Sequence, residues 1–302
     1  MATHLVPSLD ALAAERHIAR VRSMQASSWL NEEVAQRMLS RLDWMTQQPK
    51  RWLHWEPTWG GLNAHRLLTD KLPTATTVTG GYSSPARQFA AKPTGPSWAF
   101  WRSAEPLWEP GAKPVDMVWA NMSLHLQTDP MELFALWKQA LQPQGYVMFS
   151  ALGPDTLREV RQVYAVMGWA DAMHDFTDMH DWGDMLVEAG FAEPVMDMET
   201  LTLTYPNAER LIKDLRDYGG NTSRARFGQL RGKAWRAALC RSLEAQLPRT
   251  ADGQLQVTVE LIYGHAVKPD VTVPASATTH VALSDMQAML QQRKGAPPKS
   301  NK

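Results

Sequence analysis

The feature that most restricts the fold is a regular alternation of strand-like and helix-like segments between residues 114 and 268. Short apolar runs are separated by segments whose apolar residues recur at helical spacing. The predicted strands are 114–124, 142–152, 196–205 and 255–268, and the predicted helices are 129–141, 155–168, 181–191, 207–220 and 231–247. This alternation predicts an α/β fold in which a mostly parallel sheet is covered by helices on both faces. The long last segment predicts a late antiparallel strand.

The first third of the chain continues the pattern less regularly. It predicts helices at 9–24, 27–45 and 61–73, strands at 52–55 and 74–82, and a short helix, a short strand and loop within 83–114. We therefore predict a helical segment at 1–48, one α/β domain at 49–268 and a flexible tail at 269–302. Within the domain, residues 207–247 form a helical, basic insert on the substrate side.

The charge balance and the cysteine content exclude several classes of protein. Lys and Arg total 31, as do Asp and Glu, so the formal net charge is zero, whereas general nucleic-acid binders carry a basic excess. No run approaches the ~18 apolar residues of a membrane helix. The single cysteine, Cys240, excludes a disulfide framework within the chain. Because the N-terminus carries Asp10 and Glu15 and lacks an apolar signal core, we expect a cytoplasmic protein without a nucleic-acid or membrane partner.

Motifs after residue 115 are more specific than the alternation itself. One predicted strand opens with Asp116 and ends near Asn121, and a later Leu-x-Pro-x-Gly turn at 141–145 leads into a strand that ends in Ser150. The stretches LGPDTLREVR, DMHDWGDMLVEAGF, PVMDMETLTLTY and VTVELIYGHAVKP follow in this order. Together they resemble the class I S-adenosylmethionine-dependent methyltransferases and, within them, the malonyl-acyl carrier protein O-methyltransferases of biotin synthesis.

The resemblance implies a fold, a cofactor and a reaction. The fold is a Rossmann-like sheet of seven strands, the cofactor is S-adenosylmethionine, and the reaction is O-methylation of a carboxylate on an acyl-carrier thioester. Such a carboxylate is ionised at pH 7, so the reaction depends on alignment and needs no strong general base. In this family the turn after the strand at 114–124 faces the substrate, which makes His125 a candidate catalytic residue. A packed histidine is the alternative interpretation of His125.

The first cofactor motif departs from the family pattern. The stretch WLHWEPTWGG stands where the family reads like LDLGCGTG. The acidic residue of that motif falls at His54, its first two glycines fall at Glu56 and Thr58, and only its last glycine is kept, at Gly60. Each lost hydrogen bond to a charged group is worth about 1.5–3 kcal/mol, so these changes predict weakened cofactor binding.

The acid that ends the second strand of the family and holds the ribose hydroxyls is missing too, because its position falls at Gly81 or Tyr82. One hypothesis is a rebuilt cofactor loop. In it, Glu56 supplies a displaced carboxylate, aromatic rings stack on adenine, and Gly60 and Gly61 open a helix N-terminus towards a carboxylate. The candidate cofactor-binding residues are Trp55, Glu56, Gly60, Gly61, Tyr82, Ala120 and Asn121.

The other hypothesis is a methyltransferase-fold protein that has lost the cofactor and serves as a non-catalytic assembly or scaffold factor. Pro57 and Trp59 would then stiffen and fill the turn after the first strand. Fold alone does not choose between the two hypotheses, because one fold can carry many functions. Both therefore stay open at the level of sequence.

Positive charge is concentrated in residues 210–241 of this neutral chain. Nine Lys or Arg residues stand there against two Asp residues. Concentrated charge of one sign steers an oppositely charged partner, so we predict an acidic acyl carrier protein as partner of this segment. Arg224 and Arg226, in a glycine-flanked loop, are the candidate substrate-binding residues. A solvated helix face is the alternative.

An acidic stretch at 174–184 has two interpretations. It holds His174, Asp175, Asp178, His180, Asp181 and Asp184. These residue types bind metals, but they also begin helices, and Asp178 or Asp181 is a suitable N-cap for the helix that follows. We predict the helix cap and no metal ion.

Overall fold

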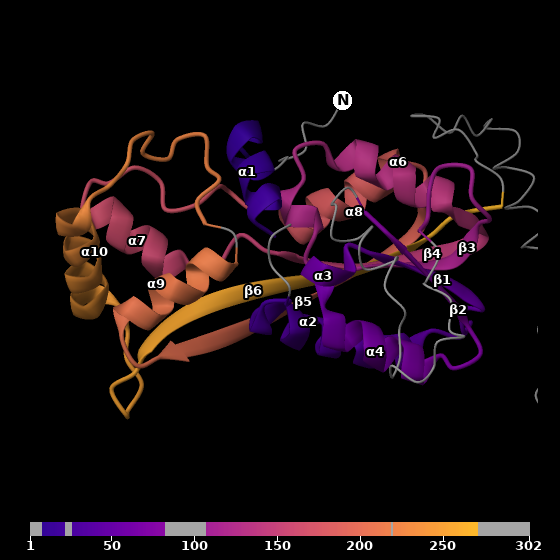
Figure 1. Ribbon diagram of the computed structural model, residues 1–302, viewed down its shortest axis with the longest axis horizontal. Helices are drawn as coiled ribbons and strands as arrows, with labels where there is room; N and C mark the ends of the chain where they lie inside the picture. Colours follow the sequence, from indigo (N-terminus) through magenta and orange to yellow (C-terminus); the bar gives the residue numbers. More distant parts are fainter. Residues whose placement is uncertain (1–7, 22–25, 82–106, 219, 271–302) are drawn as a thin grey trace, which may run out of the picture. The chain divides into compact units, whose positions relative to one another are not determined.

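The computed structural model describes residues 8–21, 26–81, 107–218 and 220–270. Its sheet has six strands in the order β2-β1-β3-β4-β6-β5 (Figure 1). The strands are β1 (Arg51–Trp55), β2 (Thr76–Gly80), β3 (Val115–Ala120), β4 (Leu141–Leu152), β5 (Ala192–Tyr205) and β6 (Leu255–Val267). The resemblance implies a seventh strand. Most of 83–114, where the sequence predicts a short strand, lies outside the described residues, as does Tyr82.

Five of these strands point the same way, and only β6 is reversed. β1 pairs parallel with β2 and β3, and β3 pairs parallel with β4. β6 pairs antiparallel with β4 on one side and with β5 on the other, so β4 and β5 share a direction. The prediction of a mostly parallel sheet with a late antiparallel strand is confirmed.

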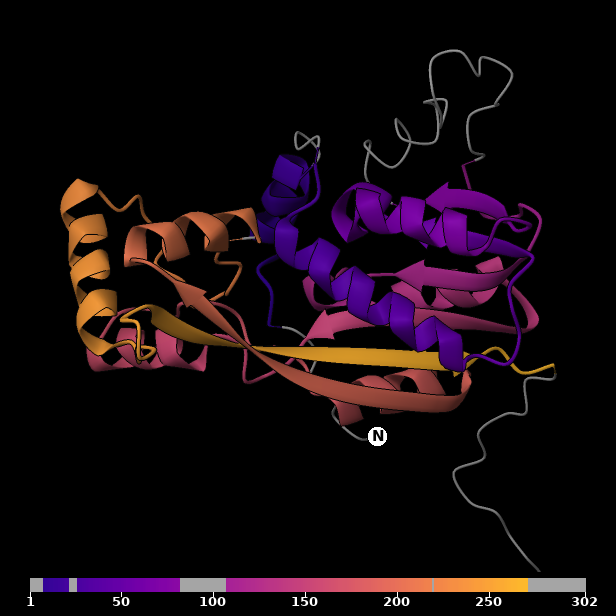
Figure 2. The ribbon, with the colours of Figure 1, turned by 90° about the horizontal axis from the view of Figure 1, so that it is seen from below.

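Helices cover both faces of the sheet (Figures 1 and 2). They are α1 (Ala11–Val21), α2 (Trp29–Arg41), α3 (Pro57–Gly60), α4 (Leu62–Lys71), α6 (Pro130–Ala140), α7 (Arg158–Val166), α8 (Met179–Glu188), α9 (Ala208–Asp217) and α10 (Lys233–Gln246). α6 and α8 lie on one face, and α2 and α4 lie on the other. α6 begins as predicted, because Asp129 caps it through the Glu132 amide and Pro130 takes its first position.

Each face of the sheet has its own core, because successive strand residues point to opposite sides. In β3, Val118 and Ala120 belong to the core that includes residues of α6 and α8. Met117 and Trp119 of the same strand belong to the core that includes residues of α2 and α4. Burial on both faces explains why the central strands read as continuous apolar runs in the sequence.

β5 and β6 extend beyond the other strands and carry a third core. Residues of α7, α9 and α10 pack there, among them Val160, Leu211 and Leu243 (Figure 1). Because Leu152 at the end of β4 pairs with Leu261, the earlier residues of β6 reach past the carboxyl end of β4. The third core therefore stands at the edge where open α/β sheets bind their ligands.

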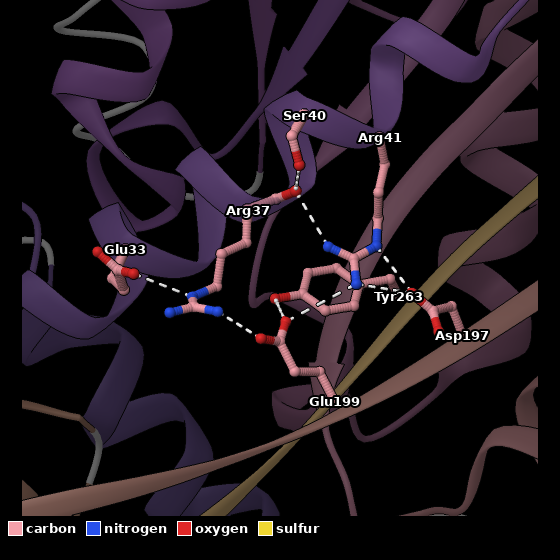
Figure 3. A network of polar contacts seen from close by, with 7 residues as sticks. All are labelled: Glu33, Arg37, Ser40, Arg41, Asp197, Glu199 and Tyr263. Carbon is pink, nitrogen blue, oxygen red and sulfur yellow. Dashed lines mark hydrogen bonds and ion pairs between the residues drawn. The ribbon is translucent and has the colours of Figure 1, made fainter.

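Two arginines of α2 fix this helix to the β5–β6 pair (Figure 3). The Arg37 guanidinium pairs with Glu199 of β5. Arg41 Nη2 lies 2.6 Å from Asp197 Oδ2, and its guanidinium carbon lies 3.7 Å from the centroid of the Tyr263 ring. One exposed ion pair contributes only about 0.2–1 kcal/mol, but a network of several also fixes an orientation. The network holds α2 so that its first turn reaches the segment after β1.

Candidate functional site

The segment after β1 is a compact helical turn and not an open loop. Glu56 leaves the strand in a left-handed conformation (φ 53°), and the Gly60 amide donates to the Glu56 carbonyl over 2.7 Å. Pro57 suits the first position of α3 because it has no amide hydrogen to leave unpaired. Trp59 is buried, and its Nε1 donates to the Met122 carbonyl over 2.7 Å. Pro57 and Trp59 thus stiffen and fill the turn.

Asn121, which follows β3, ties several segments together. Its Nδ2 donates to the carbonyls of Gly60 (2.5 Å) and Asn31 (2.8 Å), and its Oδ1 accepts from Ser150 Oγ (2.6 Å). The residue is fully buried. All three hydrogen bonds join Asn121 to other residues of the protein. The predicted cofactor-binding residue Asn121 therefore has a structural role here. Ala120, predicted beside it, is fully buried in the core of α6 and α8.

His54, which stands where the family has an acid, forms a buried pair with His65 of α4. Their Nδ1 atoms lie 2.9 Å apart, and their rings stack with 11° between the planes. Burial, with a smaller contribution from His65, holds the pKa of His54 well below its usual range. A Cβ at Gly60 would lie 3.2 Å from His54 Nε2 and 3.4 Å from the Asn121 carbonyl oxygen. The retained glycine is therefore explained by packing within the protein.

The N-terminus of α4 is occupied by a carboxylate of the protein itself. Glu32 Oε1 accepts from the Asn63 amide (3.0 Å), and Glu32 Oε2 accepts from the Ala64 amide (3.1 Å). A negative charge at this place is favourable because the first amides of a helix have no partners within the helix. The sequence predicts that Gly60 and Gly61 open this N-terminus to a ligand carboxylate. The structure corrects this: Glu32 of α2 takes that place.

A second carboxylate, that of Glu56, belongs to the residue after β1 but lies at the end of the neighbouring strand β2. Trp55 pairs with Gly80, and the Glu56 amide donates to the Gly80 carbonyl over 2.7 Å. A Cβ at Gly81 would lie 2.5 Å from both Cδ and Oε1 of Glu56. The half-buried Glu56 carboxylate thus lies where a side chain of residue 81 would begin.

These two turns fit one half of the cofactor that the resemblance implies. At the ribose half, a carboxylate lies at the end of β2. At the amino-acid half, the backbone groups are bonded to side chains of the protein, namely Glu32, Asn31 and Asn121. Trp55, predicted to stack on adenine, is buried and packs against Trp108 and Trp137. An amino-acid end would need contacts other than those of the family motif.

A cavity of about 230 Å³ lies past the carboxyl ends of β3 and β4 and is walled by α7, α9 and α10. Its wall reaches Asn31 and Trp59 at the turn after β1. Most of the lining is apolar or aromatic, as at Met122, Leu152, Phe176, Tyr205, Trp235 and Leu239. Its few polar groups include His125, His174 and Arg216. A cavity of this kind is typical of a site for a small molecule.

Two neutral histidines lie at this cavity. His174 Nε2 donates to the His125 carbonyl (3.1 Å), and His174 Nδ1 accepts from Thr222 Oγ1 (2.8 Å). His125 Nδ1 accepts from the Leu152 amide (3.4 Å), so the proton of His125 is on Nε2. Burial lowers the pKa of His174 to about 4 and that of His125 well below its usual range. His125 is therefore a poor base, and its side chain has an Nε2–H to offer to a ligand.

Arg224 and Arg226 hold the N-terminal segment in place. Arg224 Nε donates to the Leu9 carbonyl (2.8 Å), and Arg226 Nη2 pairs with Asp10 Oδ1 (3.2 Å). Asp10 also accepts from the Ala13 amide at the start of α1 (2.7 Å). The sequence predicts both arginines as anion contacts of the substrate. In the structure their guanidinium groups instead bind Leu9 and Asp10, in the segment before α1. Neither arginine lines the cavity.

The acidic stretch at 174–184 begins a helix. Asp178 accepts from the amides of His180 and Asp181, which confirms the predicted cap of α8. In the four described ranges, no three His, Cys, Asp or Glu side chains are close enough to hold a metal ion. Nor does the described part of the chain contain a helix with the length and apolarity of a membrane span.

Sequence reasoning missed three side chains that shape the site: Asn31, Glu32 and Arg216. Glu32 was visible only as an acidic residue in the first turn of a helix, which is favourable there in any case. Its contact with α4 joins residues 31 positions apart, which no local pattern reports. Arg216 was counted among the basic residues of 210–241, and only the fold brings it to the cavity.

Comparison with known proteins gives the chain a family. No protein-family model matches the sequence. A malonyl-acyl carrier protein O-methyltransferase from Gallionella capsiferriformans is 38% identical, over 81% of this chain and 86% of its own length. The chain belongs to this family. A relative of the same name from Xylella fastidiosa is 32% identical over 84% of this chain and 88% of its own length. Another, from Laribacter hongkongensis, is 42% identical over 51% of this chain and 52% of its own.

Solved structures show the same fold at much lower identity. A methyltransferase candidate from Bacillus halodurans has a TM-score of 0.50 and 12% identity, and covers 78% of this chain and 98% of that one. The YcgJ protein of Bacillus subtilis has a TM-score of 0.50 and 11% identity, and covers 78% of this chain and 100% of that one. These likenesses concern the fold alone, and they confirm the predicted Rossmann-like methyltransferase sheet.

Proposed function

We propose that the protein uses S-adenosylmethionine to methylate the free carboxylate of a malonyl-type thioester on an acyl carrier protein, as in biotin synthesis. The observation that carries this proposal is the 38% identity to a malonyl-acyl carrier protein O-methyltransferase over 81% of the chain. The cavity supports it, because it lies at the edge of the sheet where this fold places its ligands.

The cavity and its polar groups suit this reaction. The bound cofactor supplies a methyl group on a positively charged sulfur. A substrate carboxylate, with a pKa of ~4, is ionised at pH 7, so the chain has to align it and keep water out. His125 is buried and neutral, and it orients the substrate as a hydrogen-bond donor. Arg216 brings a positive charge to the cavity, which favours an anionic substrate.

The acyl carrier protein would dock on α9 and α10. Five exposed cations on these helices show no ion pair within the described part of the chain: Lys213, Arg216, Lys233, Arg236 and Arg241. By contrast, Arg210 pairs with Asp214, and Arg231 packs over Trp235 at 4.1 Å. Acyl carrier proteins are strongly acidic, so the unpaired cations would attract one to the wall of the cavity.

A second candidate function is a carrier-binding scaffold protein that transfers no methyl group. Glu32 and Asn121 favour it, because they bond the backbone groups that the family motif leaves for the amino-acid end of the cofactor. Such a protein would retain the cavity and the cations of α9 and α10 without needing the cofactor.

Calorimetric titration with S-adenosylhomocysteine, combined with a transfer assay, separates the two functions. For the methyltransferase we expect binding of S-adenosylhomocysteine and transfer of labelled methyl to malonyl-acyl carrier protein. Acetyl-acyl carrier protein, which lacks the free carboxylate, is the control and should remain unlabelled. Carrier binding without any cofactor binding at millimolar concentration would contradict the methyltransferase and support the scaffold protein.

A further inference from the structure

We propose that Glu56 supplies, from the end of β1, the carboxylate that binds the ribose hydroxyls of the cofactor. In the family this acid comes from the end of β2. The assignment rests on the proposed function and deepens it, because it names the residue that replaces a missing contact.

The register of the sheet brings Glu56 to the end of β2. β1 and β2 are parallel neighbours, and their last paired residues are Trp55 and Gly80. The hydrogen bond from the Glu56 amide to the Gly80 carbonyl (2.7 Å) extends this pairing by one residue. Glu56 and Gly81 therefore lie side by side at the carboxyl edge of the sheet, where dinucleotide-type folds bind ribose.

The two residues are complementary in shape. A Cβ at Gly81 would lie 2.5 Å from Cδ and Oε1 of Glu56, and 3.0 Å from its Cγ, so a side chain at 81 would displace the Glu56 carboxylate from this place. Gly81 also has a φ of +148°, a conformation that other residues rarely adopt. The absence of a side chain at 81 thus leaves the place that the Glu56 carboxylate occupies.

The backbone at Glu56 is consistent with a functional role. Its φ of 53° is in the left-handed region, which is uncommon for residues other than glycine, and unusual backbone conformations cluster at ligand sites. The flanking residues Trp55 and Pro57 are buried, whereas Glu56 itself is half-buried. An ionised carboxylate can accept a hydrogen bond from each of two adjacent hydroxyls, and a partly dry surrounding strengthens both.

The first experiment measures calorimetric binding of S-adenosylhomocysteine to the full chain and to two variants. Glu56→Gln keeps the size of the side chain but loses the charge, and we expect it to weaken binding roughly 10- to 100-fold. The matched control is Glu109→Gln, an exposed carboxylate on the segment beside β2, which should bind like the wild type. Thermal unfolding of each variant checks that it is folded.

The second experiment removes the hydroxyls from the ligand. The wild type should prefer S-adenosylhomocysteine to its 2′,3′-dideoxy analogue at least about tenfold, and Glu56→Ala should lose this preference. Gly81→Ala, which displaces the carboxylate, should weaken binding in the wild type but add nothing in the Glu56→Ala background. Such non-additivity is expected of two residues that act through one contact.

The outcomes separate this inference from the proposed function. If the wild type binds the cofactor product and Glu56→Gln binds it equally well, the assignment of Glu56 is overturned while the methyltransferase stands. An unchanged preference for the hydroxylated ligand in Glu56→Ala overturns it as well. If the wild type binds no cofactor product at all, the proposed function and the inference fall together.

Discussion

At the scale of single residues, buried histidines make stability depend on pH. Burial lowers the folded-state pKa of His174 to about 4, whereas an unfolded histidine has a pKa of ~6.5. The unfolded chain binds more protons between these values, so the stability is full above about pH 6.5 and is lost as the pH falls towards 4. We expect His174 alone to lower the free energy of unfolding by about 2 kcal/mol between pH 7 and pH 5.

Urea unfolding at both pH values tests this expectation. His174→Asn removes the titrating group, so the variant should lose less stability on acidification than the wild type does. His180→Asn is the control for the loss of a histidine side chain as such, because that of His180 is 77% exposed. If the free energy of unfolding depends on pH equally in the wild type and in His174→Asn, the burial of His174 is not a cause of the pH dependence.

Asn121 gives a second prediction at this scale. Asn121→Ala leaves the buried carbonyl of Gly60 without its donor and removes a second donor from the carbonyl of Asn31 in α2, and an unsatisfied buried polar group costs about 1–3 kcal/mol. We expect a loss of this size in the free energy of unfolding, measured with urea. Asn63→Ala, at an exposed position of α4, should cost much less. If Asn121→Ala lowers the free energy of unfolding no more than Asn63→Ala does, the hydrogen bonds of the Asn121 side chain do not stabilise the protein.

At the scale of elements, α2 completes α4. Glu32 of α2 accepts from the second and third residues of α4, Asn63 and Ala64. An N-terminal carboxylate of this kind contributes about 0.5–2 kcal/mol to helix stability. Glu32→Gln should therefore destabilise the protein by about 1 kcal/mol in urea unfolding. The neighbour Glu33 forms only a half-exposed i,i+4 pair with Arg37, so Glu33→Gln should cost less than about 0.5 kcal/mol, and equal costs would contradict the role of Glu32.

The same scale shows what the sequence can predict. Strands and the longer helices were predictable, because their apolar runs, spacing and caps are local, as at Asp129 and Pro130 before α6. The turn α3 was not, since four residues are too few to show a period. The contact of Arg226 with Asp10 joins residues 216 positions apart, and only the folded chain reveals it.

At the scale of the whole molecule, the sequence predicted which edge of the sheet carries the candidate site. It did not predict which segments of the fold form each part of that site. The turn after β1 contributes the Glu56 carboxylate, whereas the β5–β6 extension with α7, α9 and α10 contributes the cavity. α2 joins the two parts, because Glu32 in its first turn bonds α4, and Trp29 Nε1 donates to Asp214 of α9 over 3.1 Å. Such links depend on tertiary contacts that single-sequence patterns do not contain.

The last prediction concerns association with the acyl carrier protein. The chain is neutral overall, so the exposed cations of α9 and α10 form a local positive surface that should steer an acidic partner towards the cavity. Reversal of two of them, Lys233→Glu with Arg236→Glu, should slow association about tenfold at low ionic strength. The difference should shrink as salt rises, because the Debye length falls to ~8 Å at physiological ionic strength.

Stopped-flow measurement of carrier association over a salt series tests this steering. Lys50→Glu with Lys113→Glu is the matched control, because both lysines are exposed and precede β1 and β3, at the opposite edge of the sheet from the cavity. Arg226 and Arg231 are unsuitable for reversal, since they hold Asp10 and stack on Trp235 within the protein. If the double reversal on α10 and the double reversal of Lys50 and Lys113 slow association equally at low salt, the effect comes from net charge alone, and α9 and α10 are not the docking surface.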